Sequence, residues 1–136
     1  KGPSGDFVYE VNKYKTILML AGGYTGLAVN YRLIQSVLRN KEDNTHIKLI
    51  YANVNQEDTL YFDQINSLEA ANPEKFSVHH VLVNPPPNWT HGVGFITTDV
   101  IQKAIGSAEG YYILIAGPPV FRNTMVTDLE SIGITN

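Results

Sequence analysis

Four short runs of apolar residues recur along the chain at nearly equal intervals. They begin at Thr16, Ile47, Val78 and Tyr111, so that successive starts lie 31, 31 and 33 residues apart. Such an interval accommodates a strand, a crossover helix and the return to a neighbouring parallel strand. Because almost every position in each run is apolar, we expect the strands of a parallel sheet that is covered on both faces.

The segments between the runs show the spacing of amphipathic helices. Apolar side chains recur every three or four positions in residues 27–40 (Leu27, Tyr31, Ile34 and Leu38) and in residues 59–72 (Leu60, Ile65 and Leu68). Asp58 stands where it can cap the start of the second helix. Residues 97–106 and 120–133 predict two shorter helices, each ending at a glycine that can serve as a C-terminal cap.

Residues 84–95 differ from the rest of the chain, because they contain three consecutive prolines and two glycines. This composition predicts a surface loop, and residues 94–97 at its end predict a short strand. The whole pattern therefore predicts one α/β domain, with a parallel sheet of about five strands.

Composition and charge narrow the classes of function. A chain of 136 residues with 43% hydrophobic content is long enough for one domain with a sizeable core. The net charge of −3 argues against nucleic acid as a partner, and no apolar run approaches the ~20 residues of a membrane span. The absence of cysteine excludes disulfides, thiolate metal sites and thiol nucleophiles. The sequence begins without methionine and stops abruptly, so we interpret it as a piece of a longer polypeptide.

Polar and small residues follow each of the four runs. In open α/β sheets ligands bind outside the carboxyl ends of the strands, so these residues are the candidate site. They are residues 21–26 (AGGYTG), 53–58 (NVNQED), 84–87 (NPPP) and 117–119 (GPP). The glycine turn opens a helix, where free N–H groups and the helix dipole favour a diphosphate. A tight turn without a ligand is the alternative, since neither GxGxxG nor a P-loop lysine is present.

The turn after the second run carries two acidic residues. Glu57 and Asp58 can accept hydrogen bonds from the hydroxyl groups of a dinucleotide ribose. No basic residue occurs between Asn53 and Asp63 to receive a 2′-phosphate, which favours NADH over NADPH. A solvated acidic pair that only caps the following helix is the alternative.

Five motifs follow one another in an order that resembles a known family. They are KGPSGDFVY (residues 1–9), LMLAGGYTG (18–26), KLIYANVNQEDTL (48–60), NPPPNWTHGVGFIT (84–97) and AGPPVF (116–121). In the same order they are similar to the segment that leaves the flavin domain, the glycine turn, the second strand with its acidic turn, the proline–tryptophan–glycine stretch and the CGPPPM motif of NADH–cytochrome b5 reductases. That family, with related nitrate reductases, belongs to the ferredoxin-reductase-like flavoproteins.

The resemblance implies a Rossmann-like sheet of five parallel strands in the order 3-2-1-4-5, with helices on both faces. It implies that residues 1–14 leave a flavin domain and that residues 15–136 form the NAD-binding domain. Carried over by motif, the pyrophosphate and flavin side of the site is Gly22, Gly23, Thr25 and Gly26. Near the adenosine are Asn53, Glu57 and Asp58, and beside the nicotinamide are Ala116, Gly117, Pro118 and Pro119, with Thr25 also adjacent. Phe95 and Val120 are expected as walls of the same cleft.

The sequence departs from the family pattern at two motifs. The family turn reads GGTGITP, whereas Tyr24 is inserted here, and Ala28 and Val29 replace the second threonine and the proline. An inserted tyrosine can obstruct a diphosphate that approaches the backbone. Ala116 replaces the cysteine that the family places at the nicotinamide. Hydride transfer needs no acid or base from the protein, so we expect this change to affect rate rather than abolish reaction.

The resemblance implies the pyridine-nucleotide domain of an NADH-dependent oxidoreductase. NADH would reduce FAD held on a flavin domain, in cis or in trans, and single electrons would then pass to cytochrome b5 or a similar haem protein. The chain alone is expected to be inactive. A cytoplasmic or cytoplasm-facing location is implied, with membrane association at the endoplasmic reticulum or mitochondrion through a part outside these residues. Two alternatives remain open: a non-catalytic binding or structural module, and the reductase portion of a nitrate reductase.

Adjacent histidines, His79 and His80, lie within the third run. Successive side chains of a strand point to opposite faces, so these two histidines are not expected to form a joint metal site. No metal site is predicted elsewhere in the sequence.

Overall fold

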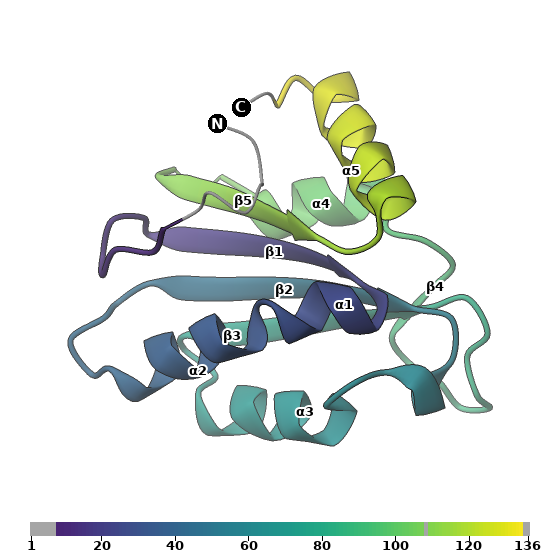
Figure 1. The fold of residues 1–136 in the computed structure, drawn as a ribbon, viewed down its shortest axis with the longest axis horizontal. Helices are drawn as coiled ribbons and strands as arrows, with labels where there is room; N and C mark the ends of the chain where they lie inside the picture. Colours follow the sequence, from purple (N-terminus) through teal and green to yellow (C-terminus); the bar gives the residue numbers. More distant parts are fainter. Residues whose placement is uncertain (1–7, 108, 135–136) are drawn as a thin grey trace.

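The computed structural model describes residues 8–107 and 109–134 and contains one parallel sheet flanked by helices (Figure 1). The strands are β1 (Thr16–Gly22), β2 (His46–Asn53), β3 (Phe76–Leu82), β4 (Gly92–Val93) and β5 (Tyr111–Ala116). The helices are α1 (Gly23–Ala28), α2 (Tyr31–Arg39), α3 (Phe62–Ala71), α4 (Thr98–Ile105) and α5 (Pro119–Ser131), with a 3-10 turn, η1, at Gln56–Asp58. The four apolar runs therefore form strands, as the sequence predicts.

The strand order confirms the predicted fold class. All pairings are parallel, and the order is β4-β3-β2-β1-β5, so the four long strands follow the predicted 3-2-1-4 arrangement. The short strand β4 differs from the prediction, because it pairs with β3, on the side of the sheet opposite to β5. It also lies at Gly92–Val93 rather than in residues 94–97. The indole Nε1 of Trp89 donates to the Gly92 carbonyl and holds the loop in this position.

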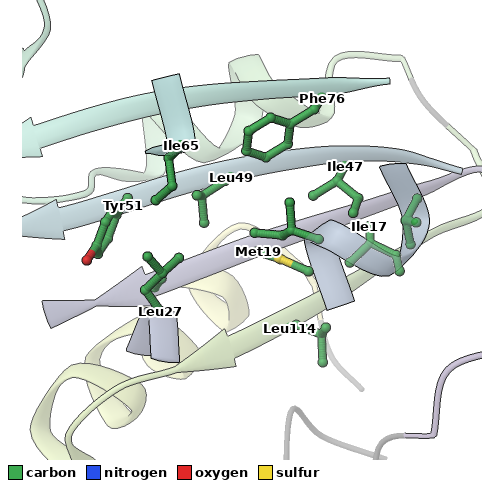
Figure 2. Close-up of a cluster of buried hydrophobic side chains, with 12 residues drawn as sticks. Ile17, Met19, Leu27, Ile47, Leu49, Tyr51, Ile65, Phe76 and Leu114 are labelled. Atoms are coloured by element: carbon green, nitrogen blue, oxygen red, sulfur yellow. The ribbon is translucent and has the colours of Figure 1, made fainter. Parts of the chain in front are cut away.

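Two hydrophobic cores cover the two faces of the sheet, because successive strand residues alternate between them. One core packs β1, β2 and β3 against Leu27 of α1, Ile34 of α2 and Ile65 of α3. Figure 2 shows these strands contributing Ile17, Met19, Ile47, Leu49, Tyr51 and Phe76 to that core. The other core packs Leu18, Leu20 and Ile50 with residues of α4 and α5. This two-sided burial explains why the strand sequences are almost continuously apolar.

The helix predicted for residues 27–40 is interrupted. Helix α1 ends at Ala28 and α2 begins at Tyr31. Between them Asn30 is buried, and its Nδ2 donates to the Gly26 carbonyl, one of the groups that α1 leaves free at its end. Leu27 and Ile34 are fully buried, as the periodicity predicts. Val37 is the third fully buried residue on this face, whereas Leu38, which the periodicity places there, is only half-buried.

The prediction that Asp58 caps the second helix is wrong. Asp58 ends the 3-10 turn η1 and accepts a hydrogen bond from Nδ2 of Asn55 at 3.0 Å. Helix α3 begins only at Phe62, after Tyr61, whose φ of 59° is left-handed and whose side chain makes no capping hydrogen bond. Thr59 closes the turn, since its hydroxyl donates to the Asn55 carbonyl. The local bonds of Asn55 therefore outcompete the cap that the sequence suggests.

The segment before β1 is fastened to the loop before β2, at the amino-terminal edge of the sheet. The Tyr9 hydroxyl donates to the buried carboxylate of Asp43 and lies 3.0 Å from the Thr45 hydroxyl. Burial by itself raises the pKa of Asp43, but its hydrogen bonds with Tyr9 and Thr45 outweigh that effect and the pKa lies below its usual value. Of the predicted segment at residues 1–14, residues 1–7 lie outside the described part of the chain.

Candidate functional site

The loops that follow β1, β2, β3 and β5 lie together at the carboxyl ends of the strands, which form what we call the carboxyl edge of the sheet. All four strands are parallel, so their carboxyl ends lie side by side, at the right in Figure 1. The starts of α1 and α5, the turn η1 and the short strand β4 lie at this same edge. The structure therefore brings together the four loops that the sequence singles out as the candidate site.

The glycine turn presents an open backbone at the centre of this edge. Gly23 begins α1 with a left-handed φ of 69°, and a Cβ built on it meets no atom within 4 Å. Thr25 is exposed on the first turn of the helix. The inserted Tyr24 is 63% exposed and also lies within α1, so its ring projects outward from the helix rather than packing into the core.

Gly26 is buried, and its surroundings show a packing role. A Cβ on Gly26 would lie 2.5 Å from the carbonyl oxygen of Ala116 at the end of β5. The missing side chain therefore allows α1 to rest directly on the backbone of the sheet. Gly26 and Ala116, both predicted as site residues, meet each other at this contact.

Phe121 packs at the candidate site, although the sequence motifs did not single it out. A Cβ on Gly22 would lie 2.5 Å from the Phe121 ring, and one on Gly117 would lie 2.9 Å from it. The ring of this α5 residue thus packs against the ends of both β1 and β5. The only signal in the sequence is the aromatic side chain four residues after Gly117, within AGPPVF.

The residues after β2 border a second part of the edge. Gln56, Glu57, Tyr61 and Asp63 help to line a cavity of about 410 Å³. Glu57 is exposed and lines this cavity, whereas Asp58 is engaged with Asn55. The two acidic residues therefore differ in their surroundings: Glu57 lines the cavity, whereas Asp58 is hydrogen-bonded within the turn η1.

An aromatic pair stands beside this cavity. The ring of Tyr61 stacks on that of Tyr31 at a centroid distance of 4.2 Å, so the first turn of α2 is joined to the segment before α3. The sequence gives no sign of this pair, because it depends on the left-handed backbone of Tyr61.

Exposed apolar residues surround the edge. Phe95 is 75% exposed and Val120 is 78% exposed. Pro118, in the loop after β5, and Pro119, the first residue of α5, are exposed as well. Single exposed apolar residues are ordinary, but several around one open edge mark an interaction surface. We therefore expect this rim to contact another molecule or another domain.

The end of β2 holds a buried polar group whose hydrogen bonding is weak. Asn53 is 9% exposed, and within the described residues its Nδ2 has no hydrogen bond of regular geometry, although its side chain interacts with the Tyr51 hydroxyl. A buried donor left unpaired costs free energy, so an acceptor on a ligand would be stabilising there. Together with the open backbone at Gly23, this donor fits a phosphorylated, hydroxyl-rich ligand such as a dinucleotide.

The two adjacent histidines point to opposite faces, as predicted. His80 is buried beside Phe62 and Trp89, and its Nε2 lies 2.9 Å from Oδ1 of Asn66 on α3. His79 lines a cavity on the other face. Within the described residues no three histidine or carboxylate side chains gather as a metal site would require.

Comparison with known proteins places these features in a family. Residues 19–127 match the family model described as the oxidoreductase NAD-binding domain. The chain is 41% identical to NADH-cytochrome b5 reductase 1 of Cryptococcus neoformans and 38% identical to that of Debaryomyces hansenii, in each case over 98% of this chain. It covers 48% and 47% of those two proteins, so it spans about half the length of the curated relatives it matches.

A solved structure shares the whole fold. The cytochrome b5 reductase domain of Ulva prolifera nitrate reductase superimposes with a TM-score of 0.88 at 30% identity, covering all of this chain and 56% of that one. The strand order and the helices on both faces are those of this class of NAD-binding domain. None of the described helices combines the length and the apolar character that a bilayer crossing requires.

Proposed function

Because the chain belongs to the oxidoreductase NAD-binding domain family, we propose that it is the NADH-binding half of a flavoprotein reductase of the NADH–cytochrome b5 reductase type. The observation that carries the proposal is the open edge of the sheet. There the bare backbone at Gly23 and the buried, weakly bonded amide of Asn53 lie at the ends of neighbouring strands. A dinucleotide lying across these two ends satisfies both features.

We assign three regions of the edge to three parts of NADH. The pyrophosphate lies over Gly22, Gly23 and Thr25, where the backbone is open. The adenosine lies toward Asn53 and Glu57, whose carboxylate accepts hydrogen bonds from the ribose hydroxyls. The nicotinamide lies beside the loop after β5, with Gly117 and Pro118, while Gly26 and Ala116 hold α1 against the sheet behind it.

The flavin belongs to a part of the protein beyond residues 15–136, and residues 1–14 lead from that part to this domain. NADH supplies a hydride and FAD accepts it, after which single electrons leave for a haem protein such as cytochrome b5. The exposed apolar rim with Phe95 and Val120 is the surface on which the flavin domain rests. A cytoplasm-facing location, with membrane attachment through another part of the protein, fits this role.

The proposal predicts a visible spectrum that responds to NADH. The intact protein containing this chain should carry a flavin absorption band, and NADH added without oxygen should bleach it. NADPH should act much more weakly, because the turn after β2 has no basic residue for a 2′-phosphate. A colourless protein, or a flavin band that NADH leaves unchanged, would contradict the proposal and favour a binding or structural module.

Glu57 gives the sharpest test of the adenosine side. We expect Glu57→Gln to weaken NADH binding about tenfold, because hydrogen bonds to a charged acceptor are stronger than those to a neutral one. Titration of the intact protein with NADH measures this directly. Glu74→Gln, a change at an exposed carboxylate in the turn before β3, is the matched control and should leave the affinity unchanged. Equal affinities for the two variants would remove Glu57 from the site.

The reductase portion of a nitrate reductase is the second candidate. The likeness to the Ulva prolifera domain favours it, since that structure covers the whole of this chain. In that case the final acceptor of the electrons would be nitrate and not cytochrome b5. NADH-dependent nitrate reduction by the intact protein separates the two candidates, and both keep the same NADH site.

A further inference from the structure

A second cavity lies away from the carboxyl edge, on the face of the sheet that carries α4. It has a volume of about 390 Å³ and lies over residues 48–50 of β2 and 77–79 of β3. Its walls combine polar side chains of the strands, the side of α4 and the intervening backbone: Lys48, Leu49, Ile50, Ser77, Val78, His79, Val100, Lys103 and Ala104. A cavity of this size suits a small ligand.

The parallel register brings the polar side chains of this cavity together. Lys48 pairs with Ser77, and Ile50 pairs with His79, so these four residues form adjacent positions on one face of the sheet. The side chains of Leu49 and Val78 pack in the core on the other face and leave only their backbone here. The Nε2 of His79 reaches the short strand β4, since a Cβ on Gly92 would lie 2.8 Å from it.

The charges around the cavity are positive. Lys103 is exposed on its rim, and Lys48 is half-buried in its wall. The ammonium group of Lys48 donates to the Ala104 carbonyl at 2.6 Å, near the end of α4, which fixes it in place and leaves two of its hydrogens for other acceptors. None of the lining residues is a carboxylate, although the whole chain carries a net charge of −3.

The rest of the lining is apolar. Val100 and Ala104 face the cavity from successive turns of α4, and Ile50 closes it from the sheet. The cavity therefore combines two ammonium groups, one from the sheet and one from α4, with a hydroxyl and several aliphatic groups, which suits a ligand that has an anionic group and a short apolar part. Burial, and then the charge of His91, lower the pKa of His79, so its ring is neutral at pH 7 and can donate to an anion without adding charge.

We propose that this cavity is a binding site for a small organic carboxylate with a short aliphatic chain, held by Lys48, Lys103 and Ser77 and packed against Val100. The site is separate from the proposed NADH site, because its residues lie within β2 and β3 and along α4 rather than in the loops after the strands. Occupancy of one site is therefore not expected to exclude the other.

Hexanoate is the probe for this proposal. Titrated into the intact protein, it should shift the NMR resonances of residues 77–79 and 100–104 and raise the pKa of the His79 ring. The NMR resonances of residues 22–26 should stay unchanged. Lys103→Gln should weaken hexanoate about threefold, as expected for a partly exposed ion pair. Lys41→Gln, which removes an exposed lysine elsewhere, should have no effect. NADH should not displace the probe.

Three outcomes would overturn the proposal. Hexylammonium or hexanol binding as tightly as hexanoate would show that the lysines do not select an anion. Inorganic phosphate binding as tightly would show that the aliphatic wall contributes nothing. Absence of shifts at residues 77–79 and 100–104 in a protein that still binds NADH would show that the cavity takes no such ligand, while leaving the proposed reductase function intact.

Discussion

Replacing Gly26 by alanine is expected to destabilise the domain by about 2 kcal/mol. The new Cβ would lie 2.5 Å from the Ala116 carbonyl oxygen and 3.2 Å from the carbonyl carbon of Ala21, and both obstacles are strand backbone. Overpacking of this kind costs about 3 kcal/mol when nothing can move aside. Alanine gains up to about 1 kcal/mol over glycine in a helix, which offsets only part of that cost. Urea unfolding followed by circular dichroism measures the difference.

Two neighbouring glycines provide the controls. Gly23→Ala meets no atom within 4 Å, so only its left-handed φ is strained and the loss should be about 1 kcal/mol. Gly22→Ala meets the ring of Phe121, a side chain that can be shortened. Combining it with Phe121→Leu should therefore recover part of the lost stability. A Gly26→Ala variant as stable as the native protein would show that α1 is free to lift from the sheet.

Acidification is expected to remove about 3 kcal/mol from the free energy of unfolding between pH 6.5 and pH 4. Burial, with smaller effects of the charges of His91 and His79, lowers the pKa of His80 from 6.5 to about 4. In this window the unfolded chain binds a proton that the folded chain does not, so stability falls as the pH falls. The lowered pKa values of His46 and His79, each caused first by burial, act in the same direction.

Unfolding by urea at several pH values tests this expectation. A His80→Gln variant, which keeps a donor near Asn66 but has no titratable ring, should lose most of the pH dependence between pH 6.5 and pH 4. His91→Gln should reduce the dependence only slightly, since the His91 charge is a smaller cause than burial of the lowered pKa of His80. If the His80 variant keeps the native pH dependence, the buried imidazole is not its source.

The strands and the candidate edge followed from local patterns. Apolar runs mark strands buried on both faces, and the residues after them necessarily lie at one edge of a parallel sheet. The contacts that shape this edge did not follow. Gly26 contacts Ala116, which lies 90 residues later in the chain. Phe121, which follows β5, contacts Gly22 at the end of the neighbouring strand β1. No local spacing encodes such long-range contacts, so they appear only when the chain is folded.

Where the sequence predicted wrongly, local hydrogen bonds decided the outcome. Asp58 has the right chemistry and position for a helix cap, but Asn55 captures it within a 3-10 turn. The long helix after the glycine turn is interrupted where Asn30 donates to the Gly26 carbonyl. In both cases an asparagine side chain competes with regular backbone structure, which periodicity of apolar residues cannot register.

The Phe121 ring makes the loops after β1 and β5 mechanically dependent on each other. It rests on Gly22 and Gly117 at once, so neither loop can be displaced without repacking the other. For protein engineering, the two loops and the first turn of α5 therefore form one transplantable module. Moving this glycine turn alone into a relative that lacks the aromatic ring would leave an unfilled gap between the strand ends, whereas moving all three pieces together preserves their packing.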